Sequence, residues 1–77
     1  MFHELEVVKI LKLLDAHRNY DGSQLVLRPP RIGDTGTIVF LHFDDGALSL
    51  CTVECVDSEG YTVWLADFLP EELQRTT

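Results

Sequence analysis

The chain has 77 residues and a mass of 8.7 kDa, with 45% apolar residues, 25% charged residues and a formal net charge of −7. This length predicts one small domain over residues 1–77, and the composition excludes a disordered tail, a collagenous chain and a multidomain enzyme. No run reaches the ~18 apolar residues of a membrane helix, and the first residues do not fit a signal peptide. We therefore expect neither a membrane segment nor a leader.

The charge is distributed unevenly along the chain. Residues 1–32 contain five bases and four acids, whereas residues 33–77 contain nine acids and a single base, Arg75. A nucleic acid requires a basic face, and only Arg28 and Arg31 supply one, which predicts against nonspecific nucleic-acid binding. The acidic half either attracts basic protein surfaces or keeps the chain soluble.

The first third of the chain is the hardest to assign. In residues 4–14 the apolar positions fit a helical stripe, but the β-branched residues favour a strand and no capping residue precedes the run. Residues 15–32 form a long loop or insertion, with a turn at 19–22, a short extended stretch at 24–27 and polyproline II at 28–31.

The remainder of the chain is predicted to be β-structure. Short strands and close turn signals indicate a small antiparallel barrel. We expect strands at 37–43, 47–56 and 61–66, turns at 33–36, 44–46 and 57–60, and one helical turn from Pro70.

The strand at 37–43 is apolar on both faces. Strict alternation places Ile38, Phe40 and His42 on one face, with Ile38 inward. It places Val39, Leu41 and Phe43 on the other face. Because a small barrel buries one face only, either residues 15–32 or a second subunit must cover the other.

The two cysteines are predicted to be unpaired. Cys51 and Cys55 lie four apart in one strand, which separates their Cα atoms by ~13 Å. A disulfide requires roughly 4.4–6.8 Å, and the chain has no other cysteine. We expect two core thiols and a reducing, cytoplasmic location.

A set of short motifs carries a family resemblance. They are Val7–Leu11, Gly-Asp-Thr-Gly-Thr at 33–37, Val-Glu-Cys-Val-Asp-Ser-Glu-Gly at 53–60, and Leu-Pro-Glu-Glu-Leu at 69–73. In this order they resemble a family of small bacterial domains of unknown function, whose turn and strand entry are similar to those of SH3-like barrels and KOW modules. The resemblance implies an all-β, five-stranded SH3-like barrel and makes residues 5–13 a strand. It implies no activity. The 15–32 insertion is longer than the family pattern.

Catalytic and metal chemistry find little support in the sequence. Cys51 or Cys55 with His42 is the only nucleophile and base pairing, and core thiols with an edge histidine explain these residues better. The histidines lie on separate segments without metal-ligand spacing. We expect a non-enzymatic protein with no cofactor and no metal.

Binding to another protein is the preferred hypothesis. Tyr61 and Trp64 have opposite strand parity, so if Val63 and Leu65 are core, Trp64 lies outside. The chain is expected to be a homo-oligomer or an accessory to another protein. The alternatives are a KOW-type nucleic-acid module using Arg28, Arg31 and the 33–36 loop, and a small-ligand binder with its ligand between barrel and insertion. The expected partner-binding residues are Trp64, Val39, Leu41, Phe43, Arg28, Arg31 and Tyr61.

Overall fold

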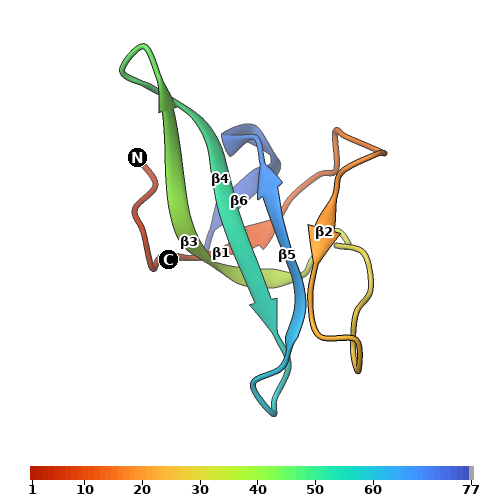
Figure 1. The fold of residues 1–77 in the computed structure, drawn as a ribbon. Helices are drawn as coiled ribbons and strands as arrows, with labels where there is room; N and C mark the ends of the chain where they lie inside the picture. Colours follow the sequence, from red (N-terminus) through yellow and green to blue (C-terminus); the bar gives the residue numbers. More distant parts are fainter. Residues whose placement is uncertain (77) are drawn as a thin grey trace.

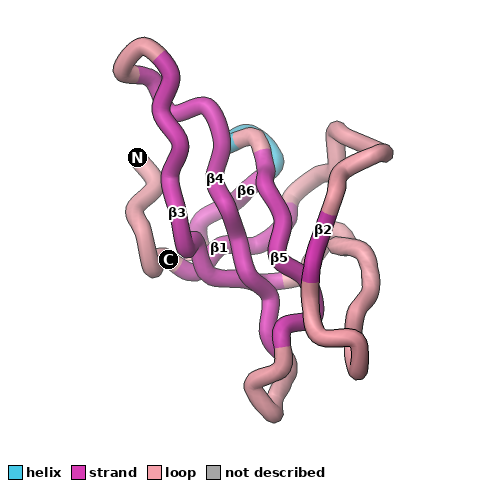
Figure 2. Tube along the Cα trace, in the orientation of Figure 1, coloured by secondary structure: helices cyan, strands magenta, loops and turns pink. Residues whose placement is uncertain are grey.

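A computed structural model describes residues 1–76 of the chain. One antiparallel sheet contains all the strands, in the order β2-β5-β4-β3-β1-β6 (Figures 1 and 2). Over residues 1–76 the edge strands β2 and β6 do not pair with each other, so the sheet is not closed. The elements are β1 (Val7–Ile10), β2 (Tyr20–Asp21), β3 (Thr35–Asp44), β4 (Ala47–Val56), β5 (Thr62–Phe68), the 3₁₀ turn η1 (Pro70–Glu72) and β6 (Leu73–Arg75).

The all-β prediction is confirmed, and residues 7–10 form a strand. The number of strands is six where five were expected. Two short edge strands were missed: β2 lies where a turn was expected at 19–22, and β6 follows the helical turn that was correctly predicted from Pro70. The prediction of an extended stretch at 24–27 is wrong, because residues 24–26 form a turn.

Strand β3 bends in its middle (Figure 1). Its first half pairs with β1, and its second half rises with β4 as a long hairpin. The bend coincides with a β-bulge, in which Ile38 pairs with Val53 but Phe40 pairs with Thr52, leaving Val39 as an extra residue. Because one extra residue exchanges the two faces of a strand, the bulge reverses the predicted alternation beyond Ile38.

The bulge corrects the predicted faces of this strand. Ile38 is fully buried, as expected, but Phe40 is 52% exposed and does not share the buried face with it. Leu41, expected on the outside, is half-buried and packs against the core. Val39 and Phe43 are exposed, as expected.

The register of β3 and β4 shifts again between His42 and Phe43, where Ser49 of β4 is the extra residue. A further bulge, on β5, determines which of its residues face the core. Cys55 pairs with Trp64 and Val56 pairs with Thr62, so Val63 is the extra residue. Trp64, Ala66 and Phe68 therefore point inward, and Leu65 is only half-buried. The core consists of Val8, Ile10, Ile38, Cys51, Val53, Cys55, Val63, Trp64, Ala66, Phe68 and Leu73.

Residues 15–32 lie on the β5 side of the sheet (Figure 2). The Ser23 N–H donates to the Thr62 carbonyl (2.8 Å), and a Cβ on Gly22 would lie 2.8 Å from the Val63 carbonyl oxygen. The segment therefore covers the bulged start of β5. It leaves Val39, Phe40 and Phe43 on the β3–β4 hairpin exposed.

Candidate interaction surface

Trp64 is 0% exposed, so the prediction that it lies outside is wrong. Its indole Nε1–H donates to Asp34 Oδ2 (2.8 Å), and its ring lies 5.4 Å from that of Phe68. The β5 bulge at Val63 turns Trp64 into the core, and the Asp34 carboxylate satisfies its one polar atom. Trp64 is an internal packing residue in the isolated chain.

Asp34 also forms an ion pair with Arg28. The guanidinium Nη1 lies 2.8 Å from Asp34 Oδ2 and Nη2 lies 3.0 Å from Oδ1, and the Arg31 N–H donates to the same carboxylate. Burial opposes ionisation of Asp34, but the bonds from Arg28, Trp64 and the Arg31 backbone outweigh it, and the pKa of Asp34 is lowered. Arg28 is thus engaged by Asp34 directly before β3, while Arg31 is exposed. The turn expected at 33–36 lies at 32–33, because Thr35 and Gly36 already belong to β3.

Glu72 is a second carboxylate that joins separate segments, and its sequence context gave no signal of this. It is 0% exposed. Oε1 accepts the Leu69 N–H (2.9 Å) and pairs with the Arg18 guanidinium, while Oε2 accepts the Leu14 N–H (2.6 Å). Burial opposes its ionisation, but these bonds lower the pKa of Glu72. Arg18 also lies 4.2 Å from the centre of the Phe68 ring.

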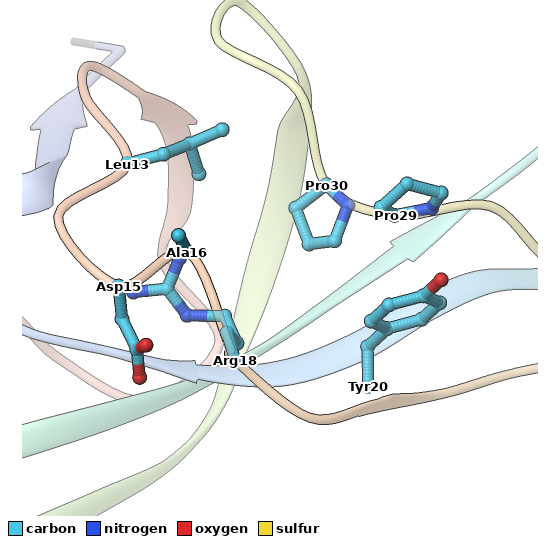
Figure 3. Close-up of a pocket in the computed structure, with 7 residues that line it drawn as sticks. All are labelled: Leu13, Asp15, Ala16, Arg18, Tyr20, Pro29 and Pro30. Carbon is cyan, nitrogen blue, oxygen red and sulfur yellow. The ribbon is translucent and has the colours of Figure 1, made fainter.

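Two shallow hollows flank Arg18. The first, of about 230 Å³, lies within the insertion and is shown in Figure 3, where Pro29 and Pro30 stand across from Arg18 and Tyr20. The second, of about 350 Å³, lies between the insertion and the sheet. It is lined by Leu14, Asp15, Arg18, Asn19, Leu50, Asp67 and Leu69.

The cysteines and His42 form no nucleophilic site. Cys51 and Cys55 are buried and unpaired, as predicted, and burial raises the pKa of both thiols. His42 Nε2 instead lies 2.7 Å from Thr52 Oγ1, whose hydroxyl donates to Asp67 Oδ1 (2.5 Å). Thr52 stands between the ring and the carboxylate, so this row is a cross-strand polar cluster without the nucleophile–base–acid order of a triad.

Phe40 and Phe43 on the β3–β4 hairpin are among the most exposed apolar side chains of the strands, together with Val7 on β1 and Val56 at the far end of β4. Val39 is 38% exposed, Phe40 52% and Phe43 56%. Leu41 and Leu48 are half-buried beside them. Three of the predicted contact residues, Val39, Leu41 and Phe43, therefore lie on this hairpin, and Phe40 is exposed on the face opposite to Leu41 and Phe43. Sequence alternation missed Phe40 because it carries no sign of the bulge before it.

Beyond Ile38 the β3 side of this hairpin is unpaired within residues 1–76, and on the other side β4 pairs with β5 only from Cys51. The Leu5 N–H donates to the Ile38 carbonyl (2.7 Å) and the Ile38 N–H donates to the Glu6 carbonyl (2.9 Å). Beyond Ile38, within residues 1–76, the edge of β3 away from β4 forms no backbone hydrogen bond as far as Asp44. Unpaired N–H and C=O groups flanked by exposed aromatic side chains form a surface for pairing with another strand.

Tyr61 lies apart from this surface. It is 42% exposed and sits at the 57–60 turn, where its N–H donates to Asp57 Oδ1 (2.9 Å). Figure 1 places this turn at the opposite end of the sheet from the tip of the β3–β4 hairpin. The predicted contact residues therefore divide into the hairpin group, the engaged Arg28, the exposed Arg31 and Tyr61, and the buried Trp64.

Comparisons with protein-family models, curated proteins and solved structures found no match to this chain. Within residues 1–76, no cluster of three or more His, Cys, Asp or Glu side chains is arranged to hold a metal ion. The same residues contain no helix of the length and apolarity needed to cross a bilayer. The family resemblance therefore stays a prediction.

Proposed function

We propose that this chain is a non-enzymatic protein-binding module that uses the unpaired edge of β3 and the apolar side chains beside it. The observation that carries the proposal is the exposure of Phe40 and Phe43 on the part of β3, beyond Ile38, whose outer edge has no backbone partner within residues 1–76. An extended segment from another protein would add to the sheet here, with main-chain bonds for affinity and aromatic contacts for selectivity. An SH3-like ancestry and a cytoplasmic location remain part of this proposal.

The charge around the edge favours the same use. The five residues from Val39 to Phe43 contain no Asp, Glu, Lys or Arg, whereas Asp44 and Asp45 follow directly. Charged side chains on an exposed edge are the usual means of preventing strand addition, and this edge lacks them over its central residues. The acidic tip would limit binding at one end and favour ligands with a base there.

Peptide selection followed by amide chemical-shift mapping tests the proposal. We expect extended peptides selected on the immobilised chain to shift the amides of Val39–Phe43 and to lose binding to the Phe43→Asp variant. The matched control is Tyr61→Asp, which changes an exposed aromatic residue to the same acid at the far end of the sheet. Shifts confined to the Arg28–Gly36 loop, or equal binding by the two variants, would contradict the proposal.

A second candidate is a small-ligand site in the hollow between the insertion and the sheet. Its volume of about 350 Å³ is at the lower end of the range for ligand sites. Arg18 lines it but already pairs with Glu72, so the hollow offers mainly Leu14, Leu50 and Leu69 to a small apolar molecule. A metabolite screen by thermal shift tests it, since a ligand that binds only the folded chain raises the midpoint.

The nucleic-acid alternative has weaker support. Of its two arginines, Arg28 pairs with Asp34 through both terminal nitrogens, which leaves Arg31 as the exposed base of the 33–36 region. A single exposed arginine in this region of a chain of charge −7 gives little attraction for phosphates. We expect no mobility shift of RNA or DNA by this protein at low salt.

A further inference from the structure

We infer that the partner of the β3 edge is a second copy of this chain, paired antiparallel about a two-fold axis at His42. The inference rests on the protein-binding function proposed above and names its partner. It follows from the direction in which the backbone groups of β3 point, and from how two identical edges satisfy each other.

The backbone groups of Leu41 and Phe43 face the unpaired edge. Ile38 points its N–H and C=O toward the β1 side, because they bond to Glu6 and Leu5. The bulge at Val39 reverses the alternation, so Phe40 and His42 point toward β4. The Ser49 hydroxyl on β4 donates to the His42 carbonyl (3.0 Å), which agrees with this assignment.

The two-fold register centred on His42 satisfies all of these groups, whereas with Phe43 on the axis Leu41 would lie opposite Asp45 of the tip turn. With His42 opposite its own copy, Leu41 lies opposite Phe43 of the second chain and Phe43 lies opposite Leu41, and each pair exchanges two hydrogen bonds. With Leu41 on the axis, Phe43 would lie opposite the bulged Val39, whose groups turn toward β4. The His42-centred register thus joins the two sheets into one continuous sheet.

The side chains fit the same register. Residues directly opposite in an antiparallel pair share a face, so Leu41 would contact Phe43 of the second chain on the core side. Leu48 pairs with Phe43 on the adjacent strand and extends this apolar cluster. The antiparallel arrangement also directs the two acidic tips at Asp44 and Asp45 to opposite ends of the interface, which limits repulsion between two chains of charge −7.

The N-terminal segment is the nearest neighbour of this edge, and its Phe2 packs against the core. The chain before Leu5 forms a turn in which the Glu6 N–H donates to the His3 carbonyl (3.2 Å). Within residues 1–76 it makes no backbone bond to Val39–Asp44, although it lies beside β3 in Figure 1. Because the contact involves one strand from each chain, the interface is small, and we expect micromolar affinity that strengthens as salt screens the net charge.

The test measures solution mass by light scattering over increasing protein concentration. We expect the natural chain and Tyr61→Asp to approach twice 8.7 kDa, and Phe43→Asp to remain near 8.7 kDa with an unchanged circular dichroism spectrum. Monomers of the natural chain at every concentration and salt level would overturn the inference. A dimer unaffected by Phe43→Asp would overturn it equally.

Disulfide trapping tests the register. His42→Cys places two thiols in a directly opposed, non-hydrogen-bonded pair, at a Cα spacing that a disulfide accepts. Phe40→Cys is the control, since its two copies would lie ~13 Å apart along the strands and cannot bridge. We expect a covalent dimer from His42→Cys only. Cross-linking of Phe40→Cys at an equal rate contradicts the register.

The two proposals fail separately. If the chain stays monomeric while selected peptides still shift Val39–Phe43, the self-pairing is wrong and the protein-binding module stands. If neither a second copy nor a peptide occupies the edge, both proposals fail.

Discussion

Two regions of the molecule differ in how their polar groups are paired: the base of the sheet, which contains Asp34 and Glu72, and the β3–β4 hairpin. At the base, two carboxylates, Asp34 and Glu72, accept hydrogen bonds from segments far apart in the sequence. No buried side-chain nitrogen or oxygen among the described residues lacks a partner. On the hairpin, the outer backbone groups of β3 beyond Ile38 have no partner among the described residues, and aromatic side chains are exposed.

From this difference we expect the base to contribute mainly to stability and the hairpin mainly to recognition. The base contains residue types that are common in functional sites, including an arginine, a tryptophan and buried acids. Their polar groups form hydrogen bonds and ion pairs with one another. The hairpin contains residues that resemble ordinary strand core, yet they contact solvent. We propose that recognition takes place on the hairpin, where the outer backbone groups of β3 beyond Ile38 have no partner within residues 1–76.

The largest expected effect is on Glu72. Glu72→Gln removes the charge that pairs with the nearly buried Arg18 and disturbs the bonds to Leu14 and Leu69. We expect the free energy of unfolding to fall by about 3 kcal/mol, because an uncompensated charge is left buried. Urea denaturation measures it. The neighbouring exposed Glu71→Gln is the control and should change stability by less than about 0.5 kcal/mol; equal losses in the two variants would remove Glu72 from this role.

A smaller loss is expected at Asp34. Asp34→Asn weakens the paired bonds to Arg28 and removes an acceptor shared with the Trp64 indole. We expect a loss of about 2 kcal/mol in the free energy of unfolding, the cost of leaving a buried polar group poorly bonded. Trp64 fluorescence during denaturation reports both stability and the loss of this contact. Asp44→Asn on the exposed tip serves as the control and should be near neutral.

Low pH should destabilise the fold through the carboxyl groups of Asp34 and Glu72. Both carboxyls have folded-state pKa values below their ordinary ones, so their contribution is fully present above the unfolded values of about 4. It is lost as the pH falls from about 4 through the folded-state values. Unfolding measured from pH 7 to pH 2 should show this decline, and the Asp34→Asn, Glu72→Gln double variant should show a shallower one. If the free energy of unfolding of the double variant depended on pH as steeply as that of the natural chain, other groups would cause the acid sensitivity.

The smallest effect on stability is expected on the hairpin. Phe43 is 56% exposed, so Phe43→Asp should alter the free energy of unfolding of the monomer by no more than about 0.5 kcal/mol. Denaturation at low protein concentration measures it. If the free energy of unfolding fell as much as in Glu72→Gln, Phe43 would be a structural residue, and the proposed difference between the two regions would be wrong.

The strands were largely predictable and the faces were not. The bounds of β4 agree with the prediction, because its apolar run lies between two clear turn signals. The single-residue bulges at Val39 and Val63 have no local sequence signature, and each reverses the alternation that follows it. Strict alternation without these bulges predicts Trp64 outside and Phe40 inside, which is the reverse of the structure. Glu72 lies in an ordinary Pro-Glu-Glu turn, and only tertiary contacts with Arg18 and Leu14 reveal its role.

Amide hydrogen exchange in dilute solution tests the central claim most directly. If the outer edge of β3 is unpaired, the amides of Leu41 and Phe43 should exchange rapidly while those of Phe40 and His42 stay protected by β4. Slow exchange at all four positions in a monomeric sample would mean that the chain already covers this edge, and the account of the hairpin as the binding surface would be wrong.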